Sequence, residues 1–433
     1  MPEDDRIEYR KTINAWCMYD WANSAFATTI LAAVFPIYYS SVAGAGLGGN
    51  RATVYWGYTV SLALFMVAVC APVLGAITDY SGAKKKFLFA FVALGVVFTS
   101  LLATVGRGDW LTASFFFVLG DVGFAGSIIF YESLLPHITT SENIDRVSSK
   151  GYAVGYLGGG LLLALNLAWI LYPKLFFMAD SEVASRVSFL SVGIWWAAFS
   201  LPLFRRVPEP PAEHSLGEMA PVRAGFRRLL TTFRHIRQYK ELTKFLIAFW
   251  LYSDGIGTII KMATIYGTEI GIGRSSLIGA LLLVQFVGIP CTMAFASVAR
   301  VLGTKRAIFL ALGIYCLVSV GGYFMREAWH FWALAAAVAS AQGGAQALSR
   351  SVFGRMVPKS KSAEFFGFYS VSSKFAGIVG PFVFALVGHI TGTSRLSIVS
   401  LIFFFVVGGL LLWRVDVEEG ARAAIAENCR VPA

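Results

Sequence analysis

The chain has 433 residues, of which 57% are hydrophobic and only 14% charged, and its mean hydropathy is +0.66. A soluble protein of this length needs far more polar surface, so the composition excludes that class. The formal net charge is +11, but most Lys and Arg fall in the termini and in alternate loops. That placement is typical of a membrane protein with a basic cytoplasmic side, and it argues against a nucleic-acid partner.

Apolar runs long enough to cross a bilayer recur along the chain, since one helical crossing needs about 20 residues. We predict twelve spans. The even number places both termini on one side, and the distribution of Lys and Arg makes that side cytoplasmic. The first six cover residues 14–40, 54–77, 87–106, 111–136, 151–172 and 187–204. The second six cover residues 244–267, 276–299, 307–325, 330–356, 367–390 and 395–414.

The first span begins with "AWCMYDWANSAFATT" and places Asp20 among aromatic residues. A charged aspartate near the centre of a span costs about 2.5–3.5 kcal/mol, so such a residue usually faces a polar cavity or a cation. Asp20, Ser24 and Thr28 recur at every fourth position and form one polar helix face. We expect this face, with Asn23 beside it, to line a central pathway.

The second span ends in "GAITDYSGAKK". The residues of this motif are Gly75, Asp79, Gly82, Lys84 and Lys85. The eighth span ends in the similar "ASVARVLGTKR", and Trp16 precedes Asp20 by the same step as Trp250 precedes Asp254. These pairs indicate a duplicated six-helix unit. We therefore predict an N-terminal bundle (1–204), a cytoplasmic linker (205–243) and a C-terminal bundle with a tail (244–433).

The fourth and fifth spans carry two further patterns. Asp121 and Glu132 are eleven residues apart and share a helix face; Asp121 is the better proton site, whereas Glu132 lies near the cytoplasmic end and could be solvated. The fifth span carries glycines at every fourth position, which permits close helix approach. We expect this glycine stripe, Gly151, Gly155 and Gly159, to pack between the two halves.

The linker starts with the proline-rich "VPEPPAEHS" and continues as "RAGFRRLLTTFRHIRQYKEL". Its apolar positions form one helical stripe flanked by arginines, as expected of a helix lying on an anionic leaflet. A solvated basic linker is the alternative.

The seventh span contains "SDGIGTIIK", with Asp254 and Lys261 on nearly the same face and about 10 Å apart along the axis. Their partners are either each other, through a strained pairing, or groups on other spans or on a ligand. Gly255 and Gly257 loosen this helix.

The eighth and tenth spans add uncharged polar residues and one arginine. Gln285 in the eighth is a lone polar residue, suited to a structural hydrogen bond. Gln342, Gln346 and Arg350 in the tenth recur at every fourth position, a stripe that could hold a carboxylate or phosphate. Alternatively, Arg350 extends to the cytoplasmic interface.

The stretch "GAITDYSGAKK" resembles the loop between spans two and three of the major facilitator superfamily, except that Tyr80 replaces the basic residue usual after the aspartate. The stretches "YDWANSAFATT", "FWLYSDGIGTI" and "GGAQALSRSVFGRMVPKSKSAEFFGFY" resemble its vacuole-effluxer branch. The resemblance implies the two-bundle fold of that superfamily, a conformational latch at Gly75, Asp79, Gly82, Lys84 and Lys85, and a monomer in a bacterial inner membrane. Fungal members of the branch are linked to amino-acid efflux.

We therefore expect a proton-coupled secondary transporter without cofactor, metal or nucleotide site, since the sequence has no GxxxxGK[ST] pattern. The charges suit a zwitterion such as an amino acid: Lys261 and Arg350 would meet its carboxylate and Asp254 its ammonium. An amphipathic solute such as a lysolipid or drug is the alternative, because many aromatic residues lie in the spans. A membrane enzyme or a sensor is disfavoured, since no catalytic spacing and no signalling domain is evident.

Overall fold

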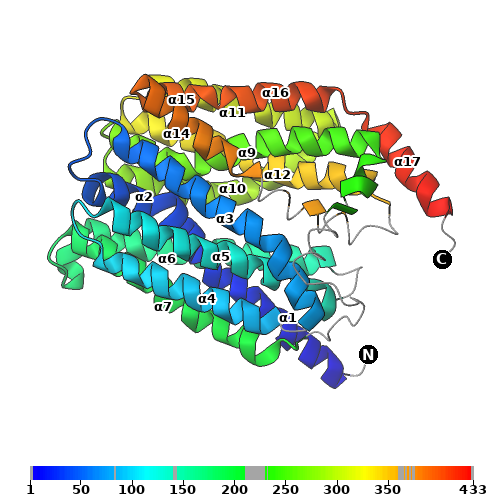
Figure 1. Cartoon of the computed structure of the whole chain (residues 1–433), viewed down its shortest axis with the longest axis horizontal. Helices are drawn as coiled ribbons and strands as arrows, with labels where there is room; N and C mark the ends of the chain where they lie inside the picture. The colour runs from blue at the N-terminus through cyan, green and yellow to red at the C-terminus, as the bar shows by residue number, and fades with distance from the viewer. Residues whose placement is uncertain are drawn as a thin grey trace. The chain divides into compact units, whose positions relative to one another are not determined.

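All regular secondary structure is helical in the part of the chain that the computed structural model describes (Figure 1). That part comprises residues 3–81, 84–139, 144–209, 230–231, 233–358, 365, 368–369, 372 and 376–430. Within 70–81, and at some other helix positions, only the backbone is described.

Nine helical stretches in these residues are long and apolar enough to cross a membrane, and the apolar helices 274–288 and 379–391 are shorter. This confirms the prediction of an all-α membrane protein.

The chain divides into two compact units: Met1–Leu47 with Leu62–Gly225, and Gly48–Ser61 with Phe226–Ala433. Helix α3 (Arg51–Ser81) therefore belongs to both. The other elements of the first unit are α1 (Glu3–Ala25), η1 (Phe26–Ala33), α2 (Val34–Tyr38), η2 (Tyr39–Ala43), α4 (Lys84–Leu101), η3 (Leu102–Thr104), α5 (Trp110–Ile138), α6 (Ile144–Leu171), η4 (Pro173–Phe176) and α7 (Ser181–Arg206). Those of the second unit are α9 (Lys240–Glu269), α10 (Arg274–Leu302), α11 (Thr304–Phe324), α12 (Ala328–Met356), α14 (Val379–Thr391), α15 (Ser394–Ser400), α16 (Ile402–Trp413) and α17 (Val417–Arg430).

The same helix pairs touch in both units, as a duplication requires. In the first unit α1 contacts α6 and α7, and α4 contacts α5 and α7. In the second unit α9 contacts α14 and α16, and α11 contacts α12 and α16. These four contacts of the first unit thus have counterparts at the equivalent pairs of spans in the second.

Two predicted segments differ from the structure. The twelfth span, predicted as 395–414, consists of two helices that meet at Leu401. The tail, for which no helix was predicted, forms α17. The linker prediction can be followed only in part, because residues 210–229 and 232 lie outside the described residues, whereas 230–231 and 233–237 are helical.

The first span changes from α to π geometry at η1. Thr28 Oγ1 donates to the carbonyls of Ser24 (3.0 Å) and Ala25 (3.3 Å). A side-chain hydroxyl that bonds these carbonyls competes with the backbone ladder, which agrees with the wider turn that begins here.

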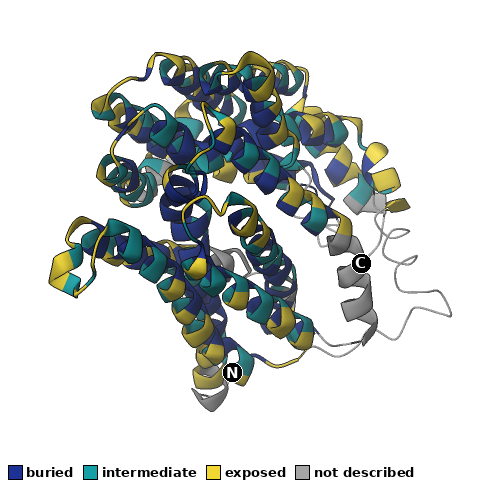
Figure 2. Ribbon diagram, turned by 60° about the vertical axis from the view of Figure 1, so that its left-hand side comes forward, coloured by how far each residue is buried: buried dark blue, intermediate teal, exposed yellow. Residues whose placement is uncertain are grey.

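Aromatic side chains fill the interior of each unit where glycines let helices approach. In the first unit a Cβ on Gly95 of α4 would collide with the ring of Trp196 on α7, whose side chain is fully buried. In the second unit a Cβ on Gly255 would lie 2.7 Å from the ring of Phe405. Figure 2 shows the resulting pattern of burial: helices have buried residues along one side and exposed residues along the other.

Candidate functional site

Asp20 on α1 is held by a tyrosine of α5 that the sequence analysis did not identify. Tyr131 Oη donates to Asp20 Oδ2 at 2.8 Å. The Tyr131 ring stacks on Trp16 at 4.3 Å between centroids, and Trp16 Nε1 donates to the Tyr131 carbonyl at 3.2 Å. The carboxylate of this span thus has a hydrogen-bond donor inside its own unit, which lowers the cost of placing it there.

The polar stripe of α1 faces the glycine stripe of α6. A Cβ on Gly155 would lie 2.7 Å from Ser24 Oγ, and one on Gly159 would lie 2.9 Å from the Ser24 carbonyl oxygen. Thr28 Oγ1 also donates to the Gly159 carbonyl at 3.2 Å. The prediction that these glycines pack between the two halves is therefore wrong, because their close partner is α1 of the same half.

A chain of buried polar groups extends from the first span into α6 and α7. Thr29 Oγ1 donates to Asn166 Oδ1 at 3.1 Å, and Asn166 Nδ2 donates to Ser191 Oγ at 3.1 Å. Asn166 is fully buried. In the sequence, a single asparagine within "LLLALNLAWIL" is the only sign of this chain.

Asp254 on α9 is buried, with 3% of its surface exposed. Its Oδ2 accepts a hydrogen bond from the backbone nitrogen of Gly380, in the first turn of α14, at 2.7 Å. Among the described residues its Oδ1 has no hydrogen-bond partner, and the hydroxyl of Thr258 donates to the Asp254 carbonyl instead. The positive end of α14 therefore stabilises this carboxylate through Oδ2.

Lys261 lies two helical turns beyond Asp254 and folds back toward it. Its ammonium nitrogen is 3.8 Å from the position that a Cβ would take on Gly257, one turn beyond Asp254. The charged ends are therefore closer together than the roughly 10 Å between the two backbone positions. Trp56 Nε1 fixes the backbone here by donating to the Lys261 carbonyl at 3.1 Å.

The other predicted pathway residues differ in exposure. Asn23 and Asp121 are buried in the first unit, and Glu132 is half-buried beside Tyr131. In the second unit Gln285 and Gln342 are half-buried, whereas Gln346 and Arg350 are exposed. Ser349, next to Arg350, is buried and bonds Tyr252 of α9 at 2.6 Å.

The two lysines of the predicted latch have partners inside the first unit. Lys84 Nζ lies 3.2 Å from His137 Nε2, and Lys85 Nζ donates to the carbonyls of Phe204 (2.9 Å) and Val207 (2.7 Å). Only the backbone of Gly75 and Asp79 is described, and Gly82 lies outside the described residues.

Lys305 repeats the role of Lys85 in the second unit. Its Nζ donates to the carbonyls of Trp413 (2.8 Å) and Val415 (2.7 Å), just where the twelfth span ends. In each half, a lysine in the first turn of the third span thus caps the end of the sixth.

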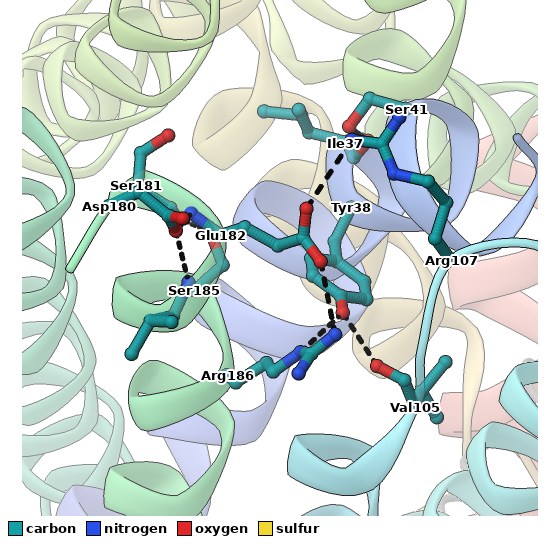
Figure 3. A network of polar contacts seen from close by, with 11 residues as sticks. Ile37, Tyr38, Ser41, Val105, Arg107, Asp180, Ser181, Glu182, Ser185 and Arg186 are labelled. Atoms are coloured by element: carbon teal, nitrogen blue, oxygen red, sulfur yellow. Dashed lines mark hydrogen bonds and ion pairs between the residues drawn. The ribbon is translucent and has the colours of Figure 1, made fainter.

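At one end of the first unit, a polar cluster joins α2, α7 and the loop after η3 (Figure 3). Tyr38 Oη donates to the Val105 carbonyl at 2.7 Å and accepts from Arg186 Nε at 2.8 Å. Glu182 lies 3.0 Å from the Arg186 guanidinium and 3.5 Å from that of Arg107. We call these residues the Tyr38 cluster; they tie the loop to two helices.

The described residues include no group of three or more His, Cys, Asp or Glu placed to hold a metal ion. Asp20 and Asp254 are instead single carboxylates, each held on the first helix of its unit by a group of the same unit.

Comparison with known proteins gives the family. The chain matches the family model described as "vacuole effluxer Atg22 like" over residues 46–425. The MFS-type transporter YxiO of Bacillus subtilis (strain 168) is 38% identical over 422 residues, which are 97% of this chain and 98% of the relative. Autophagy-related protein 22-1 of Penicillium rubens is 23% identical, covering 90% of this chain and 81% of its own.

Solved transporter structures share the fold. A D-xylose–proton symporter aligns with a TM-score of 0.69 at 14% identity, covering 95% of this chain and 99% of its own. The nucleoside transporter NupG aligns with a TM-score of 0.68 at 12% identity, covering 93% and 98%. These confirm the predicted fold of twelve membrane helices in two pseudo-symmetric bundles. The chain belongs to the vacuole effluxer Atg22-like family of the major facilitator superfamily and is an integral, multi-pass membrane transporter.

Proposed function

We propose that this transporter moves a small zwitterionic solute, an amino acid or a close analogue, by alternating access coupled to protons. In this mechanism the two halves rock about a site near the middle of the membrane. The likeness to fungal vacuole effluxers supports an amino acid as the solute class.

The observation that carries the proposal is the pair of opposite charges on α9. The Asp254 carboxylate is buried, and one of its oxygens has no hydrogen-bond partner in the part of the chain that the structure describes. The Lys261 ammonium turns back toward it over Gly257. An ammonium of the solute would satisfy Asp254 Oδ1, and its carboxylate would meet Lys261. A buried acceptor left without a donor is costly, so a ligand that supplies one gains binding energy.

Proton coupling is supported by three carboxylates that lie in spans: Asp121 and Asp254 are buried, and Asp20 is half-buried. A charge moved across a potential of 100 mV gains about 2.3 kcal/mol, which is comparable to the cost of burying one carboxylate. A carboxylate that takes a proton on one side and releases it on the other could therefore link the gradient to rocking. Asn23, Ser24, Glu132, Gln285, Gln342, Gln346 and Arg350 complete the proposed pathway.

The same proposal includes the arrangement of the chain in the membrane. Both termini and the linker 205–243 would face the cytoplasm of a bacterial cell, and the bundles 1–204 and 244–433 would work together as a monomer. The latch of Gly75, Asp79, Gly82, Lys84 and Lys85 would stabilise one conformation.

Purified protein in liposomes tests the proposal. We expect accumulation of at least one labelled amino acid that falls when the pH gradient is collapsed. Asp254→Asn and Lys261→Gln should each lower it at least tenfold, whereas Glu418→Gln, an exposed carboxylate of α17, should leave it unchanged.

Three results would contradict it. Transport unaffected by collapse of the gradient removes proton coupling, and normal transport by Asp254→Asn removes the site. Uptake of a lysolipid or hydrophobic drug, with no amino acid transported, would favour the amphipathic alternative.

A further inference from the structure

A groove of about 410 Å³ lies between the start of α4 and the end of α7, outside the proposed transport pathway. It is lined by Lys85, Lys86, Phe89, Leu201, Phe204 and Glu209. All six belong to the first unit. Because α4 begins here and α7 ends here, and both are long enough to span a membrane, the groove lies where hydrocarbon meets headgroups.

Two of the charged lining residues, Lys85 and Glu209, already form hydrogen bonds across the groove. Lys85 Nζ donates to two carbonyls at the end of α7, and Glu209 Oε1 accepts from the Lys85 backbone nitrogen at 2.9 Å. The lysine thus neutralises the negative end of α7, and the glutamate neutralises the positive end of α4. Because Lys85 and Glu209 are engaged in these hydrogen bonds, Lys86 is the remaining charged side chain that lines the groove.

Lys86 is exposed on the rim. The three charged side chains of the groove sum to one positive charge, so an anion at Lys86 would bring the groove to neutrality. An ammonium at the surface of a membrane attracts anionic lipid by about 1 kcal/mol.

Below the rim the lining is apolar and open to lipid. Phe89 is 60% exposed and Leu201 is 48% exposed, and the Phe89 ring meets the Phe204 ring edge-on at 5.6 Å between centroids. An apolar floor under a cationic rim matches a molecule with a hydrocarbon chain and an anionic head.

We propose that this groove binds an anionic phospholipid of the phosphatidylglycerol type. Its phosphate lies against Lys86, and the first part of an acyl chain covers Phe89 and Leu201. The site is separate from the solute pathway, so it holds whether or not the proposed zwitterion is transported.

Native mass spectrometry of the full chain in mild detergent tests this, with phosphatidylglycerol and phosphatidylethanolamine of identical acyl chains as probes. We expect wild type to bind phosphatidylglycerol about fivefold more tightly than Lys86→Gln, which corresponds to about 1 kcal/mol for one lysine. Lys86→Arg should retain the binding, and Leu201→Trp, which fills the floor without changing charge, should weaken it.

Arg306→Gln is the matched control, because Arg306 follows the capping Lys305 as Lys86 follows Lys85 but does not line the groove. It should bind as wild type does. Equal losses in Lys86→Gln and Arg306→Gln would indicate general attraction and overturn the proposal. Equal binding of the two phospholipids by wild type, or unchanged binding by Lys86→Gln or Leu201→Trp, would also overturn it.

Discussion

Asp254 of α9 accepts a hydrogen bond from the backbone nitrogen of Gly380, which lies 2.7 Å from its carboxylate. Asp20 of α1 holds the equivalent place in the first unit, where a Cβ on Gly151 of α6 would collide with its carboxylate. In each half, an aspartate on the first helix therefore meets a glycine on the fifth. The halves differ in the donor, which is the Tyr131 hydroxyl for Asp20 and the first turn of α14 for Asp254.

Gly380→Ala should destabilise the protein by about 1–3 kcal/mol, the usual cost of overpacking a close contact. The new Cβ would lie 2.6 Å from Asp254 Oδ1 and still closer to Thr258 Oγ1, so α14 must move away from α9. Thermal unfolding in detergent measures the loss.

Gly313→Ala is the control, since a Cβ at this helical glycine meets nothing within 4 Å. It should be neutral or slightly stabilising, because alanine favours helix more than glycine does. An equal loss of stability in both variants would mean that crowding Asp254 does not itself destabilise the protein.

Tyr131→Phe should cost about 1–3 kcal/mol, because the ring can still stack on Trp16 while Asp20 loses its donor. Tyr172→Phe, at a tyrosine that is 64% exposed, should change stability by less than about 0.5 kcal/mol. The midpoints of chemical unfolding of the two variants give the comparison. If Tyr131→Phe is as stable as Tyr172→Phe, the hydrogen bond does not stabilise Asp20.

The sequence predicted the helices well because the signal for a membrane span is local: a run of about 20 apolar residues is sufficient. The duplication was also visible, as Asp20 and Asp254 occupy equivalent positions in the two units. The partner of each aspartate was not predictable, because Tyr131 is one of 17 tyrosines and is separated from Asp20 by 111 residues.

The glycine stripe of α6 is a second case in which the sequence did not predict the packing partner. Glycines four residues apart predict that some helix approaches closely, and one does. The spacing does not say which helix, and the partner is α1, where Ser24 and Thr28 fill the space that the glycines leave.

Removal of either capping lysine should destabilise the protein by about 1–3 kcal/mol, since helix-end carbonyls lose a charged donor. Lys85→Met and Lys305→Met test the two halves. The caps share no partner, so the double variant should lose the sum of the single losses in urea unfolding. Arg306→Gln is the control; a loss as large as that of Lys305→Met would show that the loss comes from positive charge in general and not from the cap.

Arg186→Lys should loosen the loop that the Tyr38 cluster holds, although the positive charge stays. A lysine can pair with Glu182 but has a single nitrogen, so it cannot also reach Tyr38 Oη as Arg186 Nε does. We expect amide hydrogen exchange in residues 102–110 to rise about tenfold, as the loss of about 1.4 kcal/mol would give. Exchange in α11 of the other unit should not change; a uniform rise in both would contradict a local role.

The start of α17 should depend on pH through Asp416, which lies outside the predicted spans. The backbone N–H groups of Glu419 and Glu418 bond its carboxylate at 2.9 and 3.0 Å and lower its pKa from the usual 3.8. Because the pKa is lower in the folded state, the charged form contributes stability that is fully present above the unfolded value and is lost as pH falls through the folded one. Exchange of amides in 417–430, corrected for intrinsic rates, should therefore rise at acid pH in wild type, while Asp416→Asn should show a higher rate with little change over the same range. A wild-type rate that follows the variant at every pH would rule out the carboxylate as the helix cap.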